Sequence, residues 1–136
     1  MINAGYSGTP LIKKLGIKPE MKVLVIGKPE GYFEWLGADI SDQFTTKNET
    51  PDLIHLFAKD VASFKKEMGS ILKICKKNTS AIIWVSWYKK SAGIATDLSE
   101  NIIRDFALQN NLVDVKVCAV SEEWSGLKLV VPVSKR

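Results

Sequence analysis

Histidine and cysteine are nearly absent from this chain of 136 residues, which has one histidine and two cysteines. Cys75 and Cys118 form no close CxxC pair, and His55 is distant from both in the sequence. The pattern excludes a disulfide-rich miniprotein and predicts no metal site. Cys75 falls on an apolar helical stripe and Cys118 within a strand-like segment. We therefore expect both to be small core residues in a reducing compartment.

Long apolar runs and a leader segment are also missing. The longest apolar stretches, such as residues 81–85, are far shorter than the about 20 residues that span a bilayer. The N-terminus has neither the basic nor the apolar region of a signal peptide. With 46% hydrophobic and 25% charged residues, the composition is typical of a soluble globular domain. We expect one cytoplasmic domain over residues 1–136 without a membrane partner, in which residues 1–8 form either a loose tail or a lid.

Charge is distributed in blocks of alternating sign rather than in one basic stripe. The net charge is +4; residues 1–29 and 59–90 are basic, whereas residues 30–58 are acidic. Such blocks are typical of solvated helix faces. A protein that binds nucleic acid more often carries a dominant basic stripe or tail, so we predict no specific nucleic-acid partner.

Apolar segments of two kinds alternate along the chain. Continuous apolar runs predict buried strands at residues 21–26, 52–58 and 81–87. Apolar residues at helical spacing predict helices around these runs, because that spacing gives a helix one buried face. The expected helices are a short one at 10–15, one from Pro29 to about Leu36, a long one from Asp60 to 77 and one from about Thr96 to Asn110.

Two segments near the C-terminus, 113–119 and 127–131, alternate between apolar and polar residues, which is typical of half-exposed strands. Their short connection predicts a hairpin. The expected fold class is α/β, a three-layer open sheet, mostly parallel, with an antiparallel C-terminal hairpin. Lys128 and Pro132 can blunt a sheet edge, so we expect the final strand at the edge. Trp124, in the connection, either packs back onto the sheet or contacts another subunit.

The order of these elements resembles the Rossmann-like methyltransferase fold. Residues 15–27, from Leu15 to Gly27, are similar to the helix, Pro-containing turn and first strand of those enzymes. Residues 52–86 resemble the family's fourth strand, the next helix and the fifth strand. The helix from Thr96 and the final hairpin are similar to the family's closing elements. The resemblance covers most of the chain and implies a Rossmann-like sheet.

Two departures from the methyltransferase pattern concern the cofactor. The enzymes have a Gly-rich loop after the first strand, where backbone approaches S-adenosylmethionine, whereas this chain has Gly27-Lys28-Pro29-Glu30-Gly31. Only about fourteen residues stand where the enzymes have two more strands and a helix that wall in the nucleoside. The resemblance therefore implies a truncated methyltransferase-like fold that has lost S-adenosylmethionine binding, and we expect no cofactor.

Four segments resemble a family of small uncharacterised bacterial proteins. They are residues 5–11 (Gly-Tyr-Ser-Gly-Thr-Pro-Leu), 84–87 (Trp-Val-Ser-Trp), 113–120 and 124–129. These strings are long and specific, and they identify the chain as similar to that family. The family supplies no established reaction to carry over.

Open α/β sheets bind ligands beyond the carboxyl ends of their strands, where the loops after the three apolar strands should meet. The helix expected from Pro29 would point its first amides at this rim, and nearby lysines would favour an anion. Trp87 and Tyr88 could stack on a ring. The alternative is a capped helix end with solvated lysines. The candidate ligand-binding residues are Gly27, Lys28, Glu30, Gly31, Trp87, Lys89, Lys90 and Ser91.

No residue stands out as catalytic. His55 lies in an apolar run without a nucleophile motif nearby, so we expect a hydrogen-bonded core histidine. Asp97 and Glu100 have the spacing of a capping box. We therefore predict a non-catalytic binding or regulatory module for a small anionic or nucleotide-like ligand. The alternatives are a residual S-adenosylmethionine-dependent methyltransferase, and an interaction subunit or homo-oligomer that docks through its C-terminal edge and Trp124.

Overall fold

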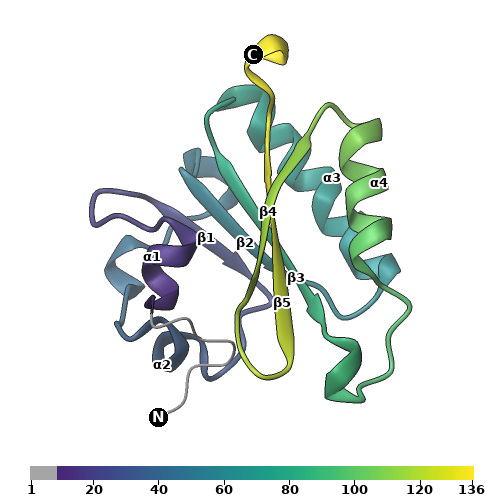
Figure 1. Cartoon of the computed structure of the whole chain (residues 1–136). Coiled ribbons are helices and arrows are strands. Elements are labelled where there is room, and N and C mark those ends of the chain that lie inside the picture. Colours follow the sequence, from purple (N-terminus) through teal and green to yellow (C-terminus); the bar gives the residue numbers. More distant parts are fainter. Residues whose placement is uncertain (1–8) are drawn as a thin grey trace.

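A five-stranded sheet forms the centre of the molecule (Figure 1). The computed structural model describes residues 9–136, so the expectation for residues 1–8 lies outside the described residues. β1, β2 and β3 are parallel, and β5 runs antiparallel to β3 and to β4. The expected mostly parallel α/β sheet with an antiparallel C-terminal hairpin is confirmed. The strands are β1 (Val23–Ile26), β2 (Leu53–Phe57), β3 (Ile82–Tyr88), β4 (Val113–Ala119) and β5 (Trp124–Val130), in the spatial order β1-β2-β3-β5-β4.

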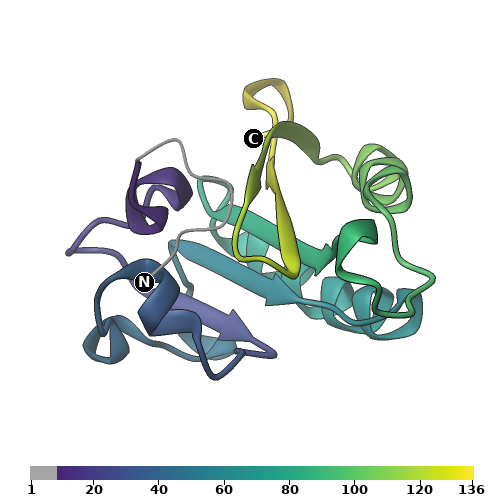
Figure 2. The same ribbon diagram turned by 60° about the horizontal axis from the view of Figure 1, so that its bottom comes forward.

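Helices cover both faces of the sheet and complete three layers (Figure 2). α3 and α4 pack on one face, where Phe64 and Ile103 join Ile54 of β2 in one core. α1 and α2 pack on the other face, where Leu15 and Tyr32 join a second core. β1, β2, β3 and β5 each contribute to both cores because successive side chains of a strand point to opposite faces. The helices are α1 (Leu11–Leu15), α2 (Tyr32–Leu36), α3 (Val61–Lys77) and α4 (Glu100–Gln109).

The long helix α3 follows the pattern that predicted it. Phe64, Met68 and Ile71 recur at helical spacing and are fully buried. The Asp60 side chain accepts a hydrogen bond from the Ser63 backbone N–H at 2.8 Å, so it caps the helix. The buried stripe and the cap together place this helix against the sheet and fix where it begins.

The helix α4 begins a turn later than predicted. Its first residue is Glu100, and the Ser99 side chain caps it by accepting a hydrogen bond from the Ile102 N–H at 3.4 Å. The Asp97 side chain instead accepts from the Val61 N–H of α3 at 2.8 Å. The predicted Asp97–Glu100 capping box is therefore wrong, because a helix distant in sequence offers Asp97 an unsatisfied backbone donor.

The final strand is not at the edge of the sheet, so that prediction is wrong: β5 lies between β3 and β4. Leu127 of β5 is fully buried, and a Cβ on Gly126 would lie 3.3 Å from the Trp84 ring of β3. β4 carries Asp114 and Lys116 and takes the outer position. The more apolar strand lies inside because both of its faces are covered there.

β1 lies at one edge of the sheet, and no strand of the part of the chain that the structure describes pairs with its outer side. The segment after α2 forms two short 3-10 turns, Ser41–Gln43 and Lys47–Glu49. Phe44 makes a single parallel bridge with Val23, whose carbonyl accepts a hydrogen bond from the Thr45 N–H at 2.9 Å. This short segment covers the outer edge of β1 in place of additional strands, and the predicted truncated sheet is confirmed.

Candidate ligand-binding site

Three loops lie at the same end of the sheet, because the strands that precede them are parallel. They comprise residues 27–31 after β1, residues 58–60 after β2 and residues 89–93 after β3. Ligands of open α/β sheets bind at this end. The candidate residues come from the first and third loops, together with Trp87 at the end of β3.

A hollow of about 830 Å³ opens at the carboxyl end of β3. Four candidate residues line it: Trp87, Lys89, Lys90 and Ser91. The rest of its wall comes from Tyr88, from residues 94–101, which lead into α4 and include its first two residues, and from Ser125 of β5. The hollow therefore combines lysines, carboxylates and hydroxyl groups on one concave surface.

The loop after β1 contributes none of the described residues that line this hollow. Gly27 has a φ of +75°, and a Cβ there would lie 2.6 Å from the carbonyl oxygen of Phe57. The Nζ of Lys28 lies 5.0 Å from the centre of the Phe33 ring, in a cation–π contact. Gly27 thus lies against β2 and Lys28 lies over α2, so the structure divides the eight candidates between two places.

The helix expected from Pro29 begins only at Tyr32, so that prediction is wrong. The carbonyl of Pro29 accepts a hydrogen bond from the Tyr32 N–H at 3.2 Å, which forms a turn before the helix. Glu30 is exposed in this turn, and a Cβ on Gly31 would lie 3.0 Å from the Trp35 ring. With five residues, α2 is too short for an anion site at its first amides.

Gly27→Ala is expected to lower the free energy of unfolding by about 3 kcal/mol, because it adds backbone strain and a clash with the Phe57 carbonyl. Gly37→Ala is the matched control: φ is +83°, but a Cβ there meets nothing within 4 Å. The control should lose only about 1 kcal/mol. Urea unfolding followed by tryptophan fluorescence measures both losses; equal losses would show that the Phe57 contact contributes nothing.

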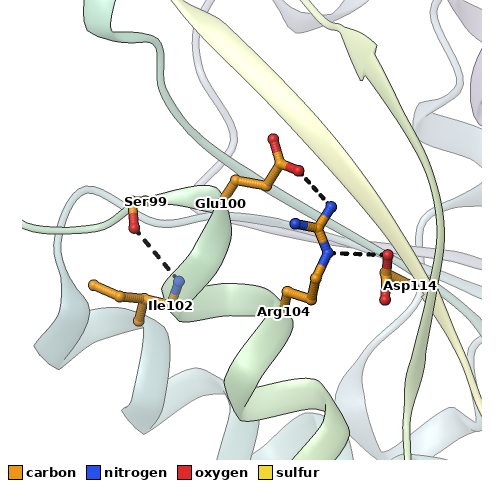
Figure 3. A network of polar contacts seen from close by, with 5 residues as sticks. All are labelled: Ser99, Glu100, Ile102, Arg104 and Asp114. Atoms are coloured by element: carbon orange, nitrogen blue, oxygen red, sulfur yellow. Dashed lines mark hydrogen bonds and ion pairs between the residues drawn. The ribbon is translucent and has the colours of Figure 1, made fainter.

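The charged groups of the hollow differ in the partners that they already have. Asp97 accepts a hydrogen bond from the first turn of α3 at 2.8 Å, and Glu100 pairs with Arg104 (Figure 3). Neither Lys89 nor Lys90 has an ion-pair partner among residues 9–136. The two lysines of the hollow are thus less neutralised by neighbouring groups than its two carboxylates are.

The aromatic residues at the end of β3 lie on opposite faces of the sheet. Trp87 is 8% exposed and belongs to the core under α3 and α4, so only a small part of its ring reaches the hollow. Tyr88 stacks on Trp124 with ring centres 4.2 Å apart, and Trp124 is 5% exposed. The predicted packing of Trp124 back onto the sheet is confirmed, and one face of the Tyr88 ring is occupied.

His55 belongs to a fully buried hydrogen-bonded trio. Its Nδ1 lies 2.9 Å from the Tyr32 hydroxyl, and its Nε2 lies 2.7 Å from the Ser86 hydroxyl. Burial lowers the pKa of His55 to about 3 and raises the pKa of Tyr32. The expected core histidine is confirmed. Sequence reasoning missed both partners; the adjacency of two parallel strands was the available signal for Ser86.

The remaining reactive residues gather at no common site. Among residues 9–136, no three His, Cys, Asp or Glu side chains come together as metal ligands. Cys75 is buried, and burial raises the pKa of its thiol to about 11, whereas Cys118 is half-buried. Over the same residues, no helix is long and apolar enough to cross a membrane.

Two solved structures are similar to this chain over most of its length. One is a SAM dependent methyltransferase from Aquifex aeolicus, with 15% sequence identity, a TM-score of 0.56, and coverage of 90% of this chain and 88% of the other. The second is a protein in the NADB-Rossmann superfamily from Streptococcus agalactiae, with 8% identity, a TM-score of 0.51, and coverage of 96% and 70%. At these identities the likeness shows the fold alone, which is Rossmann-like and methyltransferase-like. No family model and no curated protein matches the chain.

Proposed function

We propose that this chain is a non-catalytic binding module that holds a small anionic or nucleotide-like ligand in the hollow at the carboxyl end of β3. In the same proposal it is a single cytoplasmic domain and a member of the small bacterial family that its sequence resembles. The observation that carries the proposal is the pair Lys89 and Lys90 on the wall of the hollow, without carboxylate partners among residues 9–136. Two ammonium groups at a concave surface attract an anion.

Other features of the hollow support an anion over a cation. The helix α4 begins at its wall, and the N-terminal end of a helix carries partial positive charge. Asp97 and Glu100 are already engaged with α3 and with Arg104. Ser91 and Ser125 add hydroxyl donors to the wall. A phosphate or carboxylate therefore finds both charge and hydrogen-bond donors there.

The same hollow offers few side chains that could catalyse a reaction. Its described wall contains no histidine or cysteine. The pair formed by Ser86 and His55 is fully buried, so no substrate reaches it in this conformation. A general base must lie within hydrogen-bond reach of the proton that it removes. Binding without a reaction is the function that this arrangement supports best.

Isothermal titration with inorganic phosphate, AMP and ATP tests the proposal. Lys89→Ala combined with Lys90→Ala should weaken nucleotide binding by about ten-fold or more, because charge-assisted hydrogen bonds are lost. Lys65→Ala combined with Lys66→Ala removes the same charge from the exposed face of α3 and should change the affinity little. If none of the three probes binds or raises the melting temperature, the proposal fails.

A residual S-adenosylmethionine-dependent methyltransferase is the second candidate. It is supported by the likeness to the Aquifex aeolicus methyltransferase, since each chain covers about nine-tenths of the other. The short segment after α2 speaks against it, because it supplies no strands to enclose a nucleoside. Titration with S-adenosylmethionine decides between the two: micromolar binding that survives the change of Lys89 and Lys90 would favour the methyltransferase.

A further inference from the structure

The outer strand β4 combines an open edge with exposed apolar side chains. No strand pairs with its outer side in the part of the chain that the structure describes. Among the same residues, four large apolar side chains are exposed, and three lie on β4 or on α4: Leu108 (58%), Val115 (52%) and Val117 (47%). The helix α4 packs beside β4. An open edge with apolar side chains is a surface on which another strand can pair.

The face of this edge that points toward α1 is basic. Lys116 lies directly opposite Lys128 of β5, and like charges in this arrangement repel each other. Neither lysine has an ion-pair partner among residues 9–136; the Nζ of Lys116 lies 6.0 Å from the centre of the Trp84 ring. Burial raises the pKa of Cys118 on this strand, while the nearby cations Lys14 and Lys116 oppose that shift. This face has positive charge that acidic side chains can neutralise.

The face that points toward α4 has a different character. Arg104 pairs with Asp114 of β4 and with Glu100, so the carboxylate of the strand is already occupied (Figure 3). Val117 lies opposite the buried Leu127 and extends that apolar surface to the edge. This face therefore offers apolar contact. Glu100 and Asp114 carry two negative charges against the one positive charge of Arg104, which disfavours further acidic groups.

An irregularity in the pairing limits the open edge to the second half of β4. The register shifts between Asp114 and Lys116, which places a bulge at Val115. Bulges of this kind interrupt the regular row of backbone groups that an incoming strand needs. Regular pairing with β5 resumes from Lys116 to Ala119. A partner strand would pair with this short stretch.

We propose that residues 116–119 bind an extended segment of a partner protein as an additional strand, in which acidic and apolar side chains alternate. The acidic side chains would face Lys116 and Lys128, and the apolar ones would face Val117. Side chains of a strand alternate between its two faces, so such a segment matches both faces at once. A second copy of this chain fits less well, because it would bring the lysines of two basic faces together. Trp124 is buried and takes no part.

A short labelled peptide of about eight residues that alternates glutamate and valine is the probe, read by fluorescence anisotropy. It should bind at least about ten-fold more tightly than the peptide with lysine in place of glutamate. N-methylation of every residue, which removes the backbone donors of both peptide edges, should abolish binding. Lys116→Glu combined with Lys128→Glu should reverse the preference, whereas Lys65→Glu combined with Lys66→Glu should preserve it.

A second variant separates docking from folding. Val117→Glu changes an exposed side chain, so the protein should keep its melting temperature while losing affinity for the glutamate peptide. Failure of the glutamate peptide to bind, or equal binding of the lysine or N-methylated peptide, would overturn the proposal. A concentration-dependent dimer in sedimentation experiments that disappears in Val117→Glu would also overturn it, in favour of a second copy. All of these outcomes are independent of ligand binding at Lys89 and Lys90.

Discussion

Lowering the pH from 6.5 to about 3 should cost the folded protein about 5 kcal/mol of unfolding free energy through one side chain, His55. The trio of Tyr32, His55 and Ser86 is fully buried, and its hydroxyl groups lie within hydrogen-bond distance of both ring nitrogens. The folded protein therefore keeps the imidazole neutral. In the unfolded chain the same ring is hydrated and has its ordinary pKa of 6.5.

The sign of this effect follows from which state binds the proton. Between pH 6.5 and about 3, the unfolded chain is protonated at His55 and the folded protein is not. Acidification therefore favours unfolding by about 1.4 kcal/mol for each pH unit. Above pH 6.5 both states are neutral at this residue, and its contribution no longer changes with pH.

The matched variant is His55→Gln, which does not titrate but can still hydrogen-bond with Tyr32 and Ser86. Other groups that titrate in acid, such as Asp39 and Asp60, whose pKa values are lowered by hydrogen bonds from Ser41 and Ser63, are common to both proteins. The difference between the two pH dependences in urea unfolding thus isolates His55. Parallel curves would contradict the prediction.

A direct observation is also available, because this chain has a single histidine. The ring resonances of His55 in the NMR spectrum of the folded protein should not titrate as the pH passes 6.5. A transition near that value in the folded state would show that water reaches the ring, and that the trio is open at least part of the time.

Trp84→Ala is expected to lower the unfolding free energy by about 4 kcal/mol at neutral pH. Trp84 is the largest of the fully buried side chains of residues 9–136, and its Nε1–H donates to the Leu15 carbonyl at 2.9 Å. The substitution leaves a cavity between the sheet and α1 and removes the donor that satisfies the end of that helix. The lost packing and the lost hydrogen bond both weaken the contact between the sheet and α1.

Two further variants test this expectation: one separates the cavity from the hydrogen bond, and the other compares Trp84 with a less buried tryptophan. Trp84→Phe retains most of the apolar volume but removes the N–H, and should cost about 1 to 3 kcal/mol. Trp35→Ala removes a half-buried tryptophan from α2 and should cost less than Trp84→Ala. Equilibrium urea unfolding by circular dichroism measures all three. A loss for Trp84→Ala no larger than that for Trp35→Ala would contradict the packing described above.

The candidate site shows where sequence reasoning succeeds and where it ends. The parallel strands placed Gly27 and Lys89 at the same end of the sheet, as their order in the sequence implies. The sequence pattern did not show that Lys28 would lie over Phe33 of α2, or that the loop before α4 would form the other wall of the hollow. Contacts of this kind depend on side chains that no local pattern brings together.

The sequence by itself determined the type and order of the main elements, the truncated sheet and the burial of His55. Hydrophobic periodicity and the length of each segment are properties of a short stretch of sequence, so they predict these features without knowledge of distant contacts. Only the tertiary structure decided that β5 lies between β3 and β4, that Asp97 binds the first turn of α3, and that Ser86 and Tyr32 lie against His55. These outcomes depend on competition between distant segments for the same buried positions and backbone donors. Such competition is settled only when the whole chain packs.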